Sequence, residues 1–131
     1  MAERPARPLS PHLTIWRWGP HMLVSILHRV TGGALTVAGL AVLTWWLLAL
    51  ADGTDAYADF ASVSGHWAGI VVLVGLTWAF FQHLLSGIRH LFMDAGRAFE
   101  IGVNKTAANA TIIGSVLLTA ALWVYILGVF E

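Results

Sequence analysis

The stretch FASVSGHWAGIVVLVGLTWAFFQHLLSGI at residues 60–88 decides the fold of this chain. It contains no Asp, Glu, Lys or Arg over 29 residues, and about 20 apolar residues are enough for a helix to cross a bilayer. Two more uncharged runs, at residues 30–51 and 106–130, are also long enough. Strands are not expected, because no run alternates apolar with polar residues and three strands cannot close a barrel. We therefore predict an all-α membrane protein with three transmembrane helices.

The composition of the 131 residues also favours a membrane protein. Hydrophobic residues make up 58% and charged residues 11%, whereas a soluble domain has about 25% charged residues. The formal net charge is zero, so no nucleic acid partner is expected. The chain has no cysteine, which excludes disulfides, iron–sulfur ligation and a thiol nucleophile. No cleavable signal peptide is expected, because no short apolar stretch with a small-residue cleavage site precedes the first long run.

Charged residues orient the helices. The segment between the first two runs has three aspartates and no basic residue. The basic residues precede the first run or lie between the second and third: Arg4, Arg7, Arg17, Arg29, Arg89, Arg97 and Lys105. The positive-inside rule assigns that side to the cytoplasm, with the C-terminus periplasmic. We expect a multi-pass protein of the cell inner membrane.

Two parts are predicted along the chain. Residues 1–20 contain all four prolines and form a cytoplasmic or interfacial arm, because residues before proline avoid the helical conformation. Residues 21–131 form the three-helix transmembrane domain, with spans at about 22–51, 60–92 and 106–130.

Polar side chains form one stripe on each of the first two helices, because residues three or four apart share a helix face. The stripes are Ser25, His28, Arg29 and Gly32 on the first helix, and His83, Gly87, His90 and Asp94 on the second. The first helix enters from the cytoplasm and the second returns to it. The two stripes are therefore expected to meet at the cytoplasmic end.

His83 lies inside an uncharged run, six residues before Arg89, and so roughly 9 Å deeper in the membrane. A polar side chain in hydrocarbon needs a partner. The pattern leaves two roles open, an interhelical hydrogen bond or a haem ligand. His66 lies about 25 Å away along the helix and cannot share a metal with His83. A six-coordinate haem would thus need its second ligand from another subunit.

For the other polar residues the pattern alone favours ordinary roles. His28 and His90 read as boundary histidines bonded to water, and Arg29 as a side chain reaching the headgroups. The Ser25 hydroxyl can bond to a carbonyl of its own helix. Asp94 and Arg97 can form an ordinary surface ion pair.

Three segments carry a resemblance to a known family: RPLSPHLTIW at residues 7–16, SILHRVTG at 25–32 and HLLSGIRHLFMD at 83–94. In this order they resemble the cytochrome b subunit of succinate dehydrogenase, a membrane anchor of respiratory complex II. The resemblance covers the arm and the first two helices, and the third run contributes only hydropathy. Trp16 departs from the tyrosine that is common at its position in the family.

The resemblance implies site residues. His83 corresponds to an axial ligand of a b-type haem shared with a second anchor subunit. His28 and Arg29 correspond to groups near the haem propionates, and His90 and Asp94 take supporting places in or beside the haem pocket.

Ser25 and Arg29 also correspond to ubiquinone-site residues, and Trp18 and Ile26 are expected to line that site. A serine hydroxyl and a guanidinium can donate hydrogen bonds to a quinone carbonyl and stabilise charge as it is reduced.

The resemblance further implies an iron–sulfur subunit and a flavoprotein subunit as partners, so that the chain belongs to an enzyme without itself oxidising succinate. Nothing in the sequence resembles a flavin or dicarboxylate site. A haem-free structural anchor stays open as an alternative. A small transporter or channel subunit is disfavoured, because the first and third helices lack a deep ionisable residue.

Overall fold

The computed structural model describes residue 12 and residues 17–129, and these residues contain helices and no strand. The elements are α1 (Pro20–Ala34), the π-helix η1 (Leu35–Gly39), α2 (Leu40–Asp52), α3 (Thr54–Gly65), α4 (Trp67–Asp94) and α5 (Ile101–Val129). Three helices are long and apolar enough to cross a membrane. This confirms the predicted all-α architecture. The arm predicted at residues 1–20 lies largely outside the described residues.

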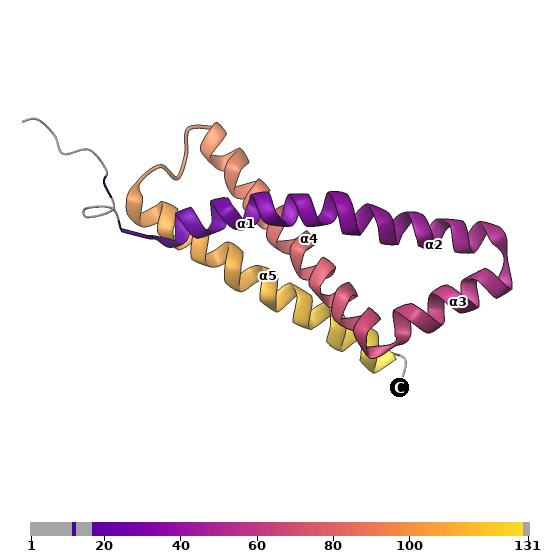
Figure 1. Cartoon of the computed structure of the whole chain (residues 1–131). Helices are drawn as coiled ribbons and strands as arrows, with labels where there is room; N and C mark the ends of the chain where they lie inside the picture. Colours follow the sequence, from indigo (N-terminus) through magenta and orange to yellow (C-terminus); the bar gives the residue numbers. More distant parts are fainter. Residues whose placement is uncertain (1–11, 13–16, 130–131) are drawn as a thin grey trace, which may run out of the picture.

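The first span is one continuous helix built from α1, η1 and α2 (Figure 1). Pro20 begins it, where the missing N–H of proline is no loss and its fixed φ suits the helix. The helix ends at Asp52, and the following Gly53 has a φ of 106°, which glycine adopts at little cost. The span therefore runs from Pro20 to Asp52, slightly longer than the predicted 22–51.

The second uncharged run is not one helix, which corrects the span expected at about 60–92. Its first residues belong to α3, and α4 begins only at Trp67. Between them His66 is extended, and its Nδ1 accepts a hydrogen bond from the Ala68 N–H at 3.4 Å. A Cβ on Gly69 would lie 2.2 Å from the Val63 carbonyl oxygen, so glycine is what lets α3 fold back on α4. Hydropathy alone does not reveal this break.

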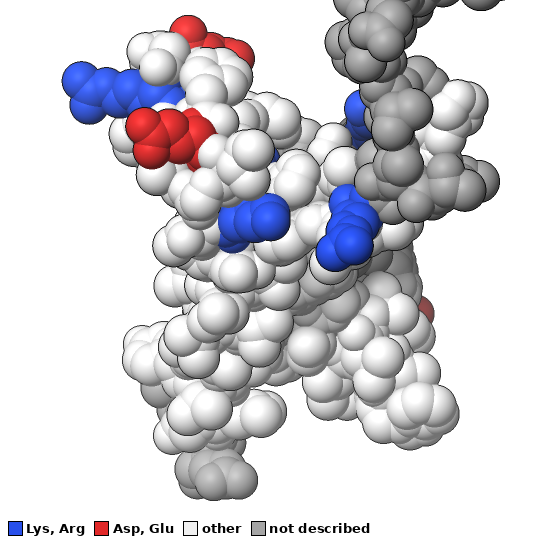
Figure 2. Space-filling model, turned by 90° about the vertical axis from the view of Figure 1, so that its left-hand side faces the viewer, with Lys and Arg blue, Asp and Glu red and all other residues white. Residues whose placement is uncertain are grey.

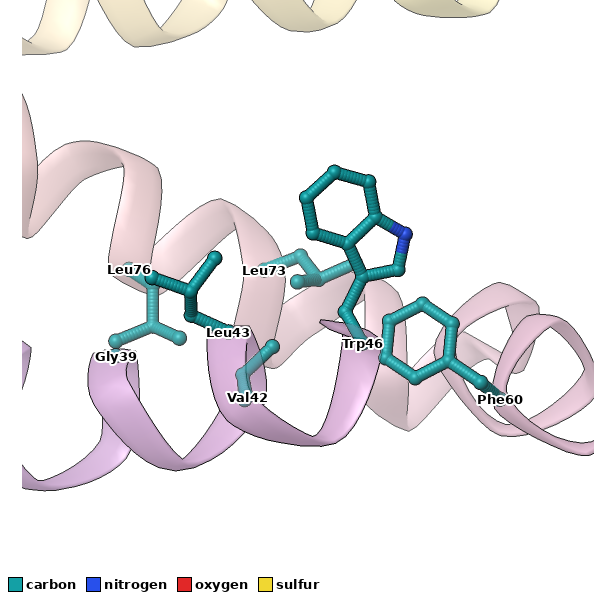
Figure 3. A pocket seen from close by; sticks show the side chains of 7 residues that line it. All are labelled: Gly39, Val42, Leu43, Trp46, Phe60, Leu73 and Leu76. Atoms are coloured by element: carbon teal, nitrogen blue, oxygen red, sulfur yellow. The ribbon is translucent and has the colours of Figure 1, made fainter. Parts of the chain in front are cut away.

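The helices form a crossed arrangement (Figure 1). The helices α4 and α5 pack against each other, and α1 contacts both. Beyond this crossing α2 diverges from α4, and α3 bridges the ends of the two. An apolar hollow of about 350 Å³ lies in the resulting wedge (Figure 3). It is lined by Gly39, Val42, Leu43, Trp46, Phe60, Leu73 and Leu76.

Hydroxyl groups and small side chains join α5 to the rest of the bundle. Ala108, Thr111, Ser115 and Thr119 are buried and recur three or four residues apart. The Ser115 hydroxyl donates to Gln82 Oε1 of α4 at 2.8 Å. Helices in a membrane commonly associate through such small and hydrogen-bonding residues. The third run, predicted from hydropathy alone to begin at 106, starts at Ile101 and carries this packing stripe.

Basic side chains are confined to one end of the described part of the molecule, whereas acidic side chains lie at both ends. Lys and Arg gather where α1 and α5 begin and α4 ends, together with Asp94 and Glu100 (Figure 2). Asp52, Asp55 and Asp59 lie at the other end, at the close of α2 and in α3. This is the pattern on which the predicted orientation depends.

Candidate functional site

Three histidines meet where α1 crosses α4. The rings of His28 and His83 stack with centroids 3.9 Å apart and planes within 9° of parallel. The His90 ring lies 5.3 Å from His28 and is tilted by 56°. The two polar stripes predicted on the first and second helices therefore do meet at their histidines. The sequence reached this result because helical periodicity fixes which residues share a face.

Hydrogen bonding leaves one nitrogen of His83 available. Its Nδ1 lies 3.1 Å from the His28 carbonyl oxygen and 3.4 Å from Thr31 Oγ1. The Thr31 hydroxyl is also 2.7 Å from the Leu27 carbonyl, to which it donates. Since a carbonyl can only accept, the His83 Nδ1 carries the proton in this bond, and Nε2 keeps its lone pair. A histidine that binds a metal usually has this kind of bond on its other nitrogen.

Gly32 gives the His83 ring its space. A Cβ at position 32 would lie 2.9 Å from His83 Cε1, closer than real Cβ contacts allow. A Cβ on the neighbouring Gly33 would meet no described atom from elsewhere in the chain within 4 Å. Only the first glycine of this pair is therefore needed for the close approach of α1 to the histidine.

Ser86 and Thr31 are site residues that the pattern analysis missed. Both are buried. Ser86 Oγ lies 2.6 Å from His28 Nδ1 and 3.2 Å from the His83 carbonyl oxygen. Each follows a predicted histidine by three residues, Ser86 after His83 and Thr31 after His28. That spacing places each of them on the same helix face as its histidine, so the sequence could have predicted that they lie at the site.

A metal bound at this site would depend on few protein ligands. Within the described part of the chain, no group of three or more His, Cys, Asp or Glu side chains is arranged to hold an ion. Because the His28 ring stacks flat on His83, the two rings are not placed to hold one metal from opposite sides. The donor set thus fits a metal that brings most of its own ligands, as haem iron does.

Comparison with known proteins identifies the family of this chain. The family model described as succinate dehydrogenase/fumarate reductase transmembrane subunit matches residues 3–122. The chain belongs to this family. It is therefore a multi-pass membrane protein.

Several relatives of this chain are named as cytochrome b subunits of succinate dehydrogenase. The succinate dehydrogenase cytochrome b556 subunit of Paracoccus denitrificans is 45% identical over 88% of each chain. The subunit of the same name from Rickettsia conorii is 42% identical over 90% of this chain and 91% of its own. The mitochondrial cytochrome b560 subunit of Sus scrofa is 32% identical over 88% of this chain and 69% of its own.

In this transmembrane subunit, the residues expected at a quinone site differ in how deeply they are buried. Ser25 is half-buried on α1, while Arg29 and Ile26 are exposed. Trp18 borders a hollow of about 250 Å³ whose lining includes neither Ser25 nor Arg29. That hollow is lined by Trp18, Gly19, Pro20 and Leu23. The four predicted quinone residues thus occupy one end of α1 and the chain just before it.

Two charged residues differ from what the pattern suggested. Asp94 is exposed at the end of α4, and no ion pair forms among the residues described, so the surface ion pair considered for it is not present there. Arg89, taken as the charged exit of the second span, is only 7% exposed. Its Nη2 donates to Asn104 Oδ1 of α5. Arg89 therefore faces α5 and joins it to α4.

Proposed function

We propose that this chain is a membrane anchor of succinate dehydrogenase and helps to pass electrons from succinate oxidation to ubiquinone. The names of its relatives support this assignment. In this proposal an iron–sulfur subunit and a flavoprotein subunit dock at the end rich in Lys and Arg. The positive-inside rule makes that end cytoplasmic, in the cell inner membrane, and makes the C-terminus periplasmic. Succinate is oxidised on the flavoprotein, outside this chain.

The hydrogen bonding of His83 carries the haem part of the proposal. Its Nδ1 is held by the His28 carbonyl at 3.1 Å, so Nε2 is ready to bind iron. A b-type haem, when bound, supplies a centre that takes up and releases one electron. The second axial ligand comes from another anchor subunit, because the ring beside His83 is stacked and not opposed. His90 closes the pocket beside His28, and Asp94 supports the end of α4.

A haem propionate is anionic, so it is stabilised by a nearby positive charge and by N–H groups that donate hydrogen bonds to it. The exposed guanidinium of Arg29 supplies a permanent charge with several donors. His28 has one ring nitrogen engaged with Ser86, which leaves its Nε2 for a propionate. Both side chains come from adjacent positions of α1.

Ubiquinone reduction requires hydrogen-bond donors at the quinone carbonyls. We assign this role to the Ser25 hydroxyl and the Arg29 guanidinium, which lie one turn apart on α1. Donors aimed at an oxygen stabilise the negative charge that develops on it as the ring is reduced. Ile26 and Trp18 add apolar surface at the same end of α1, suited to the quinone ring and its tail.

The haem assignment is tested by a reduced-minus-oxidised spectrum of the purified complex. We expect b-type absorption bands in the wild type, lost in His83→Leu because leucine cannot bind iron. The matched control is His66→Asn, which changes a histidine at the far end of α4 and keeps an N-cap acceptor. The control should keep the bands. Bands that survive unchanged in His83→Leu would contradict the assignment, and a wild type without them would favour a haem-free anchor.

The quinone assignment has a separate test. Ser25→Ala and Arg29→Leu should reduce quinone-dependent activity, while succinate oxidation with an artificial soluble acceptor is kept. Removing one such donor typically costs about 10²-fold or more in rate. Equal loss of both activities would point to failed assembly, and unchanged quinone reduction would remove these residues from the site.

A further inference from the structure

We propose that Ser86 is a positioning residue that holds the His28 ring flat against His83 and so fixes the orientation of the haem ligand. The inference rests on the proposed role of His83. Ser86 touches neither the iron nor the quinone in this scheme. It acts through His28.

The first step is that each helix holds the histidine of the other. The α1 backbone, through the His28 carbonyl, binds the ring of His83 on α4. In return α4, through Ser86 Oγ, binds the ring of His28 on α1 at 2.6 Å. Ser86 Oγ is also 3.2 Å from the His83 carbonyl oxygen, which links it to the backbone of the ligand residue. The two histidines are thus fixed by two reciprocal contacts across one helix crossing.

The second step is that the ring stack needs such a restraint. Aromatic pairs usually settle with centroids about 4.5–7 Å apart, offset or edge to face. The His28 and His83 rings lie closer, at 3.9 Å, and almost parallel. Ser86 could satisfy its own hydroxyl within α4, as buried serines in helices commonly do. The shorter bond to His28 shows that the serine does more than this.

The third step connects the stack to the ligand. The His83 ring has Gly32 beside its Cε1 and the His28 ring on one face. With both neighbours in place the imidazole plane cannot turn freely about its bond to Cβ. The orientation of axial imidazole planes affects the electron paramagnetic resonance spectrum of a ferric low-spin haem. Hydrogen bonds around an axial ligand also tune the reduction potential.

The test compares haem signals in the purified complex for the wild type, Ser86→Ala and Ser86→Thr. We expect Ser86→Ala to keep haem, because His83 and Gly32 are intact, but to shift or broaden the largest g value and to change the haem midpoint potential. Ser86→Thr restores the hydroxyl and should return both signals toward the wild type. The matched control is Ser115→Ala. Ser115 is equally buried, but it lies on α5 and bonds to Gln82, on the face of α4 away from the histidines. It should give the wild-type signals.

The outcomes separate this inference from the proposed function. Wild-type signals in a haem-bearing Ser86→Ala complex would overturn the positioning role, and so would equal shifts in Ser86→Ala and Ser115→Ala. If Ser86→Ala does not assemble, Ser86→Cys keeps nearly the same volume with a weak hydrogen bond, and the same comparison decides. A different result would contradict the haem assignment itself. In that case the b-type absorption bands would be absent from the wild type or would survive unchanged in His83→Leu.

Discussion

The two faces of α4 are built from different chemistry although they share one helix. Gln82 and His83 are neighbours in sequence, yet Gln82 bonds to Ser115 of α5 while His83 stacks on His28 of α1. The α5 face is closed by hydroxyls and small residues, which bring helices together in a membrane. The α1 face keeps imidazoles half-buried, with one nitrogen of His83 free. In the proposed function, the same helix therefore serves assembly on one side and a redox site on the other.

The largest expected effect lies on the α1 face, at Gly32. In Gly32→Ala the new methyl group would lie 2.9 Å from His83 Cε1, so the ring must move. Disturbing what surrounds and orients a metal ligand commonly weakens metal binding by about 10- to 100-fold, and we expect haem content to fall strongly. Haem per complex is measured by pyridine haemochrome.

Gly33→Ala is the control for that change, because position 33 has open space. It should leave haem content as in the wild type. Equal haem content in both variants would mean that the close approach of Gly32 to His83 does not matter to the site.

A second effect lies on the α5 face, at Asn104. Asn104→Leu removes the acceptor of the buried Arg89 guanidinium, whose Nε has no hydrogen-bond partner within the described residues. An unsatisfied buried charged group costs about 3 kcal/mol. We expect less assembled complex after graded heating, with the haem bands of the surviving complex unchanged.

Asn109→Leu makes the same change at an exposed position of α5 and should have little effect on assembly. If Asn104→Leu altered the haem spectrum without lowering stability, the division of α4 into two faces would fail at Arg89.

The smallest effect is expected at Ser115. Ser115→Ala removes the 2.8 Å hydrogen bond to Gln82, and such bonds in membranes contribute about 0.6 kcal/mol. Heat resistance of the complex should fall slightly, more than in Thr106→Ala, whose hydroxyl is exposed and bonds only to its own helix. A loss as large as that of Asn104→Leu would show that the hydroxyl stripe contributes more than ordinary helix packing.

Much of the fold follows from the sequence, because three uncharged runs leave few alternatives to three membrane helices. The meeting of His28 with His83 also follows, since periodicity and opposite helix directions bring the two stripes to one end. The break at His66 does not follow, because it depends on the contact between Gly69 and the Val63 carbonyl and not on hydropathy.

The surroundings of Arg89 and Ser86 could not be predicted from the sequence pattern. An arginine at the end of an apolar run usually reaches the headgroups, yet Asn104 gives Arg89 a buried partner. Ser86 carried a readable signal, being three residues after His83, but its bond to His28 depends on the distance between two helices. The stripe Thr111, Ser115 and Thr119 was likewise visible as a repeat of four.

The π-helix η1 gives the first span an unexpected tolerance. A π turn contains about one residue more than an α turn, so it absorbs the additional residue without turning α2 relative to α1. Deleting one residue from Leu35–Gly39 would let a regular helix form, and both halves of the span would keep the faces that they present now. Elsewhere in a membrane helix the same deletion would turn every following side chain by about 100°. The first span can therefore lose one residue at its centre while His28 and Gly32 still face α4 and α2 still lines the apolar hollow.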